Sequence, residues 1–132
     1  MRISLSKALR KLGYIDECKL YSEINTYSQQ TYNENFPETK LIEDIKSVDK
    51  KDIDQMIPDH DILLAGFPCQ PFSRAGISKR KNLKRAYGFE DKDQGNLFFN
   101  ILDILNIKKP RAFVLENVQN LKNHQGGKLL NK

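Results

Sequence analysis

Apolar and polar positions follow two different periods along the chain, and these predict short helices interleaved with short strands. Apolar residues recur at helical spacing up to Gly13, which predicts an amphipathic helix that ends there. Asn25 is a suitable N-cap for a second helix over about Thr26–Asn35, and Pro37 prevents its continuation. A third helix is expected over about residues 96–106, where five side chains form one apolar face: Leu97, Phe98, Ile101, Leu102 and Leu105.

Four apolar stretches between the helices are expected to be strands: residues 18–21, 40–42, 61–65 and 112–115. The stretch 61–65 is the most apolar and is typical of a buried strand, and a short helix from Asp49 to about Met56 precedes it. Because helices and strands alternate, the predicted fold class is α/β, with a doubly wound, mostly parallel sheet covered by helices on both faces. The 132 residues are enough for one modest domain.

The predicted order of elements opens on a helix instead of a strand. Doubly wound sheets begin with a strand and a glycine-rich turn that leads into the first helix, and in the order 3-2-1-4-5 that strand is central. We therefore expect the sheet to lack its first strand and glycine-rich turn. The expected result is a gap between the strand at residues 18–21 and the strand at residues 61–65, with two unpaired edges.

Composition narrows the class of protein. The 39% of apolar residues allow a core, while 30% of charged residues and the lack of a long apolar run exclude a transmembrane span. The first residues contain no continuous apolar segment of a secretory signal. Two cysteines alone, Cys18 and Cys69, make a disulfide unlikely and favour a reducing cytoplasm, with Cys18 packing as a small apolar side chain. His60 and His124 stand apart, so we expect structural or solvated roles and no metal site.

The net charge of +5, from 22 basic and 17 acidic residues, is compatible with a nucleic-acid partner but is weak support for one. One segment is basic without any acidic residue; it contains Arg74, Lys79, Arg80, Lys81, Lys84 and Arg85. Two interpretations of this segment stay open, a solvated loop and a set of contacts to phosphates. Its position directly after Cys69 supports the second.

Polar groups that could carry chemistry follow the four predicted strands: Glu23, Asp44, Cys69 and Glu116. Ligands of open α/β sheets bind beyond the carboxyl ends of the strands, and Cys69 stands there between two prolines that each fix φ, so its thiol is a candidate nucleophile. A carboxylate past the second strand of a nucleotide-binding fold can accept hydrogen bonds from ribose hydroxyls. Glu23 alone is equally well explained as a solvated turn residue, and Asp44 alone is better explained so. The occurrence of all four residues directly after predicted strands favours a functional site.

The bacterial DNA (cytosine-5-)-methyltransferases resemble this chain at these same positions. Their catalytic motif is similar to residues 66–73, GFPCQPFS, and their second catalytic motif is similar to residues 113–118, FVLENV. The stretch that carries the helix after their catalytic loop resembles residues 88–91 and 95–99, GFED and GNLFF. Their cofactor-binding segments resemble residues 22–24 and 43–45, SEI and EDI. The resemblance covers about residues 2–128.

This resemblance implies a fold of the S-adenosylmethionine-dependent methyltransferase type, S-adenosyl-L-methionine as cofactor and double-stranded DNA as partner, with no metal and no membrane. Cys69 would attack carbon 6 of a cytosine flipped out of the duplex, and Glu116 would stabilise the charge that develops at ring nitrogen 3. The implied cofactor contacts are Glu23, Ile24, Asp44, Ile45, Phe67, Pro68 and Leu97. The implied DNA contacts are Gln70, Ser73, Arg74, Lys79, Arg80, Lys81, Lys84 and Arg85.

The chain also departs from the family pattern. We find no glycine-rich first motif, no later arginine-containing catalytic motif and no target recognition domain, and Gln94 precedes Gly95 where the family usually has arginine. We therefore expect residues 1–132 to be a partial catalytic domain. It is either one part of a split or truncated methyltransferase of a restriction–modification system, which needs a complementary chain, or an inactive fragment or non-catalytic DNA-binding or regulatory subunit. Another kind of thiol enzyme has little support, because Cys69 has no C-x-x-C partner and no nearby histidine.

Overall fold

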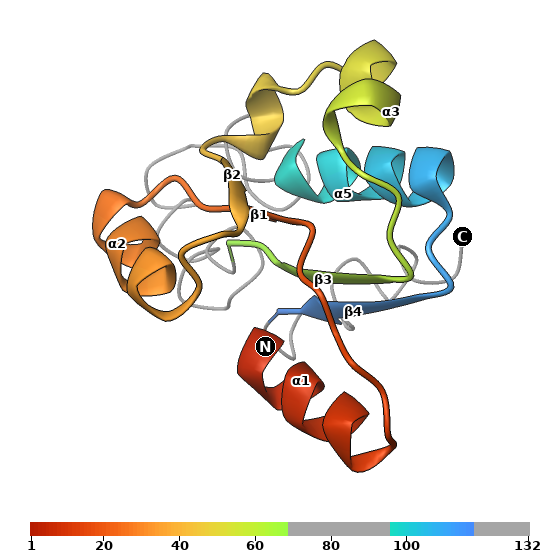
Figure 1. Cartoon of the computed structure of the whole chain (residues 1–132). Helices are drawn as coiled ribbons and strands as arrows, with labels where there is room; N and C mark the ends of the chain where they lie inside the picture. Colours follow the sequence, from red (N-terminus) through yellow and green to blue (C-terminus); the bar gives the residue numbers. More distant parts are fainter. Residues whose placement is uncertain (69–95, 118–132) are drawn as a thin grey trace, which may run out of the picture.

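Two pairs of parallel strands with helices packed around them make up the computed structural model, which describes residues 1–68 and 96–117 (Figure 1). The elements follow one another in the order α1 (Arg2–Lys11), β1 (Leu20–Ser22), α2 (Thr26–Asn35), β2 (Lys40–Ile42), the 3-10 helices η1 (Ile45–Ser47) and η2 (Lys50–Asp52), α3 (Ile53–Met56), β3 (Ile62–Gly66), α5 (Asn96–Lys108) and β4 (Ala112–Glu116). Cys69, the basic segment, Gln94 and His124 lie outside the described residues.

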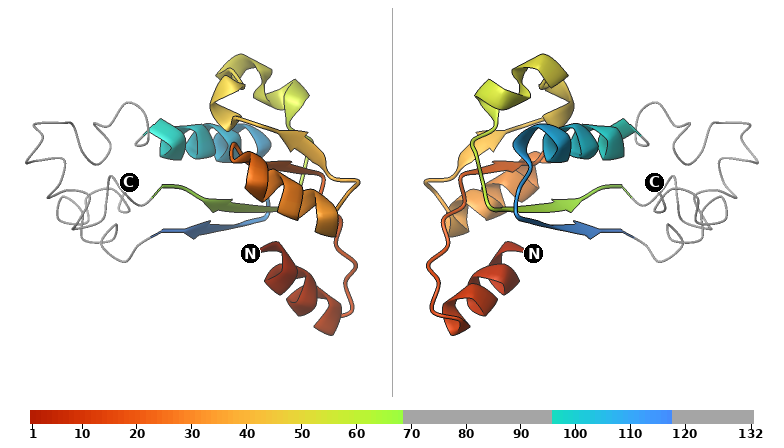
Figure 2. Two further views of the ribbon diagram at one scale, coloured as in Figure 1. Left: turned by 90° about the vertical axis from the view of Figure 1, so that its left-hand side faces the viewer. Right: turned by 90° about the vertical axis from the view of Figure 1, so that its right-hand side faces the viewer.

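The strands pair as β1 with β2 and β3 with β4, and both pairs are parallel, which confirms the predicted strand direction. Residue Tyr21 pairs with Leu41 at the centre of the first pair, and the second pair ends with Gly66 opposite Glu116. The carboxyl ends of both pairs lie on the same side of the molecule (Figure 2). The residues that follow the strands of both pairs are therefore on the same side of the molecule.

Local signals determine the ends of the first two helices. The Asn25 side chain accepts a hydrogen bond from the backbone N–H of Ser28 at 3.0 Å, so the predicted N-cap of α2 is confirmed. Gly13 has φ of 81°, and its N–H donates to the carbonyl of Arg10. This is the left-handed conformation that glycine adopts at the end of a helix, and it confirms the predicted stop of α1.

Helix α1 buries less than its apolar spacing predicts. None of its residues is buried, and the side chain of Leu12 is 72% exposed. Figure 1 shows the helix extending below β3 and β4, where its first residue approaches the strands. The Cε atom of Met1 lies 3.6 Å from the position that a Cβ on Gly66 would take. An apolar stripe predicts which face of a helix can be buried. That face is buried only where another element of the fold packs against it.

Helix α5 forms the core together with the elements on either side of it. Its residues Phe98 and Ile101 pack against Phe67 at the end of β3, and Ile104 belongs to a second cluster with Ile53 of α3. Because α5 packs against both β3 and α3, it holds in place the strand that leads toward Cys69 in the sequence. The prediction of residues 96–106 is correct in kind, and the helix runs two residues further, to Lys108.

Strands β3 and β4 are less buried than the sequence suggests. The stretch predicted as a buried strand is half-buried along Ile62–Gly66 up to its exposed last residue, and Phe113 of β4 is 56% exposed. The reason is that α5 packs against this pair, while each of the two strands has only the other as a paired neighbour in the described part of the chain. A run of apolar residues therefore predicts a strand here but not its full burial.

The segment between β2 and β3 differs from the single short helix expected from Asp49 to Met56. It contains η1, η2 and α3, and the Asp49 side chain makes no capping hydrogen bond. Asp44 caps η1 instead, because its Oδ1 accepts from the backbone N–H of Lys46 at 2.9 Å. No helix within residues 1–68 and 96–117 is long and apolar enough to cross a bilayer.

Candidate active site

The carboxyl ends of β3 and β4 bring together the two segments that resemble catalytic motifs. Gly66 and Glu116 are register partners at the last position of the ladder. The Glu116 Oε2 atom lies 3.5 Å from the position of a Cβ on Gly66, so the carboxylate rests against the glycine backbone. Phe67 and Pro68 follow Gly66, and the next residue in the sequence is Cys69. The carboxylate is therefore placed beside the segment that leads into the candidate nucleophile.

Phe67 is fixed through both its ring and its carbonyl group. The ring is 5% exposed, and its centroid lies 5.4 Å from that of Phe98 at an interplanar angle of 52°. The Asn117 side chain donates a hydrogen bond from Nδ2 to the Phe67 carbonyl oxygen at 2.9 Å. Leu97 is half-buried in the same cluster. Phe67 is one of the predicted cofactor contacts. Its ring packs in the core, so its backbone is the part that lies at the strand end.

Asn117 is a residue whose contact the sequence interpretation missed. It stands in the motif FVLENV, but nothing in its own residue type indicates a bond to Phe67, 50 positions earlier. Its position directly after the acidic residue at a strand end is the signal that could have drawn attention to it.

The carboxyl end of β1 presents a carboxylate next to an apolar side chain. Glu23 Oε1 accepts from the backbone N–H of Asn25 at 2.8 Å, and the Gln29 side chain donates to the Glu23 carbonyl at 2.5 Å. Ile24 is 68% exposed. A carboxylate can accept from ribose hydroxyls, and an exposed aliphatic side chain can pack on a flat base. This hydrogen-bond acceptor and this apolar side chain fit the nucleoside part of S-adenosylmethionine.

The carboxyl end of β2 lies beside that of β1. The Ser22 hydroxyl donates to the Glu43 carbonyl at 3.5 Å, which joins the two turns after the strands. Asp44 caps η1 with one carboxylate oxygen, and its other oxygen lies 3.9 Å from the Lys46 ammonium. Ile45 is half-buried against the cluster around Ile53. The predicted cofactor residues of β1 and β2 are therefore neighbours, and those of the β3 turn belong to the other strand pair.

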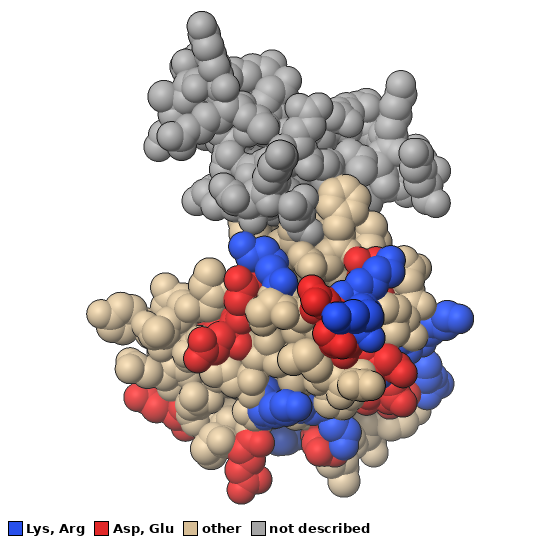
Figure 3. Space-filling model, turned by 90° about the horizontal axis from the view of Figure 1, so that it is seen from above, with Lys and Arg blue, Asp and Glu red and all other residues tan. Residues whose placement is uncertain are grey.

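The face formed by η2, α3 and α5 carries basic and acidic side chains side by side (Figure 3). Lys50 pairs with Asp103 at 2.6 Å, and Lys108 pairs with Asp54 at 2.9 Å. These lysines are neutralised locally by their partners. The residues predicted to contact DNA are all in the range 70–85, which lies outside the described residues.

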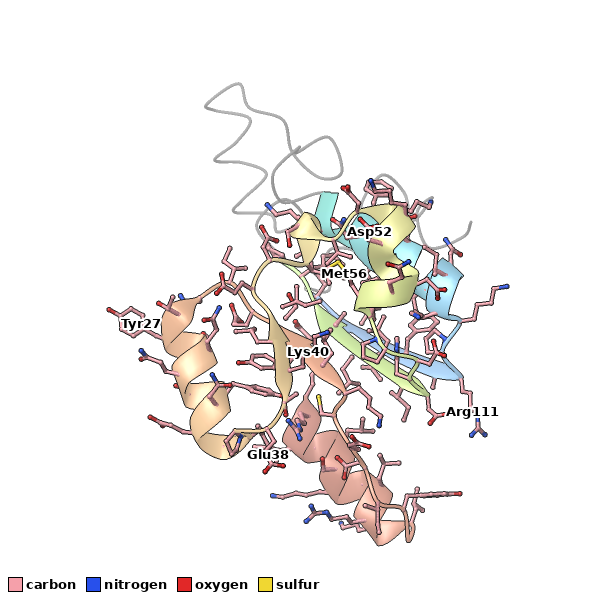
Figure 4. The ribbon with its side chains drawn as sticks, turned by 45° about the horizontal axis from the view of Figure 1, so that its top comes forward. Tyr27, Glu38, Lys40, Asp52, Met56 and Arg111 are labelled. Atoms are coloured by element: carbon pink, nitrogen blue, oxygen red, sulfur yellow. The ribbon has the colours of Figure 1, made fainter. Side chains whose placement is uncertain are left out.

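Two further features of the described chain do not include the predicted site residues. A pocket of ≈ 460 Å³ lies between the start of α1 and helix α2, lined by Ile3, Tyr27, Ser28, Thr31, Tyr32, Asn35 and Phe36. Tyr27 at its rim points away from α2 (Figure 4). The His60 ring makes a hydrogen bond through Nδ1 with the Pro58 carbonyl at 2.9 Å. Within residues 1–68 and 96–117, no three His, Cys, Asp or Glu side chains lie close enough together to hold a metal ion.

Comparison with known proteins decides the family. The family model of the C-5 cytosine-specific DNA methylases matches residues 3–132. The chain belongs to this family. Membership of the C-5 cytosine-specific DNA methylases confirms the resemblance that the strand-end motifs indicated, and it agrees with parallel strands and packed helices in one α/β fold.

Several curated relatives support the same assignment. A DNA-cytosine methyltransferase of Escherichia coli strain K12 is 44% identical, over 85% of this chain and 27% of the relative. The type II methyltransferase M.NgoBI of Neisseria gonorrhoeae is 51% identical, over 81% of this chain and 29% of the relative. The type II methyltransferase M.NlaX of Neisseria lactamica is 50% identical, over 86% of this chain and 32% of the relative. The chain thus spans about a third or less of the length of these C-5 cytosine-specific DNA methylase relatives.

Proposed function

We propose that this chain carries the nucleophile and the nucleoside-binding segments of a DNA (cytosine-5-)-methyltransferase. The observation that supports this most is the register of β3 and β4, which sets the Glu116 carboxylate against Gly66, three residues before Cys69. A thiol nucleophile and an acid on adjacent parallel strand ends are the two groups that methylation of cytosine carbon 5 requires.

The first chemical step activates carbon 5, which by itself is a weak nucleophile. The Cys69 thiolate forms a bond to carbon 6, and the electron pair of the ring double bond moves toward carbon 5. Glu116 holds a proton at ring nitrogen 3, so the negative charge that develops in the ring is stabilised by hydrogen bonding. The two groups must act on the same ring, and the pairing of Gly66 with Glu116 supports this, because the chain continues from Gly66 to Cys69 within three residues.

Methyl transfer and release complete the reaction. S-adenosylmethionine would supply the methyl group from its sulfonium: a bond forms between carbon 5 and the methyl carbon, the bond from sulfur to that carbon breaks, and the thioether S-adenosylhomocysteine leaves. Carbon 5 then loses its proton to a base, the bond between carbon 6 and the Cys69 sulfur breaks, and the ring double bond re-forms with the thiolate as leaving group. The chain ends the cycle unchanged, with the methyl group on carbon 5.

Cofactor binding is assigned to the two strand pairs together. Glu23 and Asp44 accept hydrogen bonds from the nucleoside, and Ile24 and Ile45 pack on the adenine. Pro68, Leu97 and the backbone of Phe67 border the methionine side, since the Phe67 ring is buried in the core. We further propose that β1–β2 and β3–β4 belong to one doubly wound sheet. Parallel strands and carboxyl ends on one side support this arrangement (Figure 2).

DNA binding is assigned to the segment that follows Cys69. The atoms that react are inaccessible within a duplex, so the cytosine has to be flipped out, and the segment from Ser73 to Arg85 is the one proposed to close over it. The six basic residues of this segment are assigned to phosphates, and Gln70 and Ser73 are further proposed DNA contacts. Since the matched relatives are about three times longer, full activity also requires segments equivalent to their remaining parts, carried by the same polypeptide or by a complementary chain. Two of these relatives are named type II methyltransferases, which favours a restriction–modification setting.

A methyl-transfer assay tests the proposal directly. The natural protein that contains these residues is incubated with genomic DNA and S-adenosylmethionine labelled in its methyl group, alone and together with a chain that carries the complementary methyltransferase segments. Labelled 5-methylcytosine is expected in the DNA for the wild type, and Cys69→Ser is expected to abolish it. The matched control is Cys18→Ser, which changes the other cysteine and should retain activity. Methylation that survives Cys69→Ser would show that the proposed nucleophile is wrong.

A further inference from the structure

Asn117 connects the two strand ends at the point where their backbone pairing stops. The ladder of β3 and β4 ends with Gly66 opposite Glu116, so the backbone of Phe67 is beyond the last paired position. The hydrogen bond from Asn117 Nδ2 to the Phe67 carbonyl, 2.9 Å long, extends the connection by one residue. It joins residues 50 positions apart, and the Asn117 side chain is half-buried there.

This hydrogen bond acts on a peptide group whose other freedoms are already restricted. The Phe67 ring is anchored in the core against Phe98, so the residue cannot shift along the strand without disturbing that contact. The carbonyl that Asn117 holds belongs to the peptide between Phe67 and Pro68. Pro68 has a fixed φ and no N–H, so the direction of the chain into residue 69 depends on the orientation of this peptide and on the ψ angle of Pro68.

The residue before Asn117 is the proposed acid. Glu116 rests its carboxylate against Gly66, and Asn117 holds the peptide that follows Gly66 and Phe67. The last residue of β4 and the residue after it therefore contact two successive positions at the end of β3, Gly66 and Phe67. The Glu116 side chain is the one proposed for the chemistry, and the Asn117 side chain holds the backbone.

We propose that Asn117 is a positioning residue, which holds the Phe67–Pro68 peptide in the orientation that brings the Cys69 thiol and the Glu116 carboxylate to the same ring. This inference rests on the proposed function. Asn117 acts through the Phe67 carbonyl and not on the substrate. Misplacing a reacting group by about 1 Å can cost about 100-fold in rate. Removal of the hydrogen bond should therefore lower the rate of methyl transfer much more than it lowers binding or stability.

The test compares two replacements that differ in whether they keep the amide donor. Asn117→Asp has the same shape but presents a carboxylate to the Phe67 carbonyl, whereas Asn117→Gln keeps an amide N–H on a longer side chain. We expect Asn117→Asp to lower kcat for methyl transfer by about 10- to 100-fold, with KM for DNA within about twofold of the wild type. Asn117→Gln should recover part of this loss. Asn106→Asp, the same change at an exposed position of α5, is the matched control and should retain the wild-type kcat.

The outcomes separate this inference from the proposed function on which it rests. If the wild-type protein transfers no methyl group, the proposed function fails. If the wild type is active and Asn117→Asp keeps its kcat, the positioning role is wrong. The role is also wrong if both replacements lower kcat equally while the thermal midpoint falls enough to unfold the protein at the assay temperature, because that result describes a purely structural residue.

Discussion

Tyr32 is the side chain through which α1, β1 and α2 meet. Its hydroxyl accepts a hydrogen bond from Arg2 Nη1 at 2.6 Å and lies 3.5 Å from the Cys18 sulfur, and its ring stacks on Tyr21 with centroids 3.8 Å apart. Burial raises the pKa of Tyr32, and the hydrogen bond with Cys18 raises it further, whereas the one from Arg2 lowers it. The folded state therefore favours the neutral phenol. The contacts of the Cys18 sulfur are thus with polar groups, the Tyr32 hydroxyl and the Leu20 carbonyl.

An alkaline titration should identify Tyr32 among the five tyrosines. Its pKa in the folded protein lies above its ordinary value of 10.0, so the folded state keeps this proton at a pH where the unfolded state has lost it. Its contribution to stability is therefore full below pH 10 and is lost as the pH rises through the folded pKa. Tyrosinate absorbance should show one late component that Tyr32→Phe removes. Tyr14→Phe, at a 63% exposed position, should leave that component in place; the opposite pattern would refute the assignment.

At the residue scale, the sequence predicts those site residues whose type is itself reactive or charged and whose position follows a strand. Glu116 was found because an acid ends an apolar strand, and the structure sets its carboxylate against Gly66. The bond of Asn117 to Phe67 was not found, because it depends on the register of two strands that are far apart in the sequence. Such a contact has no periodicity and becomes visible only when the strands are paired.

At the scale of elements, α5 organises the molecule because it packs into two clusters. Ile101 packs with Phe67 near the strand ends, and Ile104 packs with Ile53 and Val48 below α3. The predicted apolar face of this helix included Ile101 but not Ile104. A single stripe was expected, and the second cluster exists because η2 and α3 fold back over the helix (Figure 1).

Replacement of either isoleucine by alanine should destabilise the protein by a similar amount. Both side chains are 5% exposed, so Ile101→Ala and Ile104→Ala each remove buried methyl groups and leave a cavity, which costs about 2–5 kcal/mol. Asn106→Ala, on an exposed position of the same helix, should change the free energy of unfolding by no more than about 0.5 kcal/mol. Urea denaturation measures all three. A cost as small as that of the control for either isoleucine would contradict the two-cluster description.

Lys108, the last residue of α5, forms ion pairs with two residues of the segment that precedes β3. Its ammonium lies 2.9 Å from Asp54 Oδ1 and 3.0 Å from Asp59 Oδ1, and the Lys108 side chain is 4% exposed. The hydrogen bond with Asp54 raises the pKa of Lys108 most, that with Asp59 adds to the rise, and desolvation opposes them. The charged form of Lys108 is therefore the one that the fold stabilises.

Lys108→Met should lower the urea midpoint at neutral pH, because two carboxylates lose their shared cation. Since the pKa of Lys108 is raised above 10.5 in the folded protein, the wild type has this contribution in full below pH 10.5 and loses it as the pH rises through the folded pKa. The difference between the wild type and Lys108→Met should therefore shrink at strongly alkaline pH. Lys7→Met, at an exposed position of α1, is the control. A difference that stays constant over this range would show that packing of the side chain, and not its charge, is what matters.

Local and non-local signals explain which elements the sequence could predict. Helix α2 and strand β2 have the predicted bounds because a cap at Asn25 and a break at Pro37 act within a few residues. Strand β1 was expected at residues 18–21 but begins at Leu20, since its pairing with Lys40–Ile42 selects which residues form the ladder. The burial of α1 was overestimated for the same reason: it depends on a partner surface.

At the scale of the whole molecule, the direction of the strands places the candidate site residues that follow them on one side. Both strand pairs direct their carboxyl ends to one side, where Glu23 and Asp44 follow one pair and Glu116 follows the other (Figure 2). The family assignment covers residues 3–132, which includes Cys69 and the basic segment. The account as a whole therefore depends on one thiol that reacts with one base.

Covalent trapping of that reaction is the most direct measurement. DNA in which 5-fluorocytosine replaces cytosine should stop the reaction after methyl transfer, because the fluorine on carbon 5 cannot leave as a cation and the thiol remains attached to carbon 6. The natural protein is incubated with this DNA and S-adenosylmethionine, and the adduct is digested and located by mass spectrometry. The account predicts a methylated fluorocytosine adduct on Cys69 that needs the cofactor and persists in Cys18→Ser. An adduct on Cys18, or none in a protein that still methylates DNA, would contradict it.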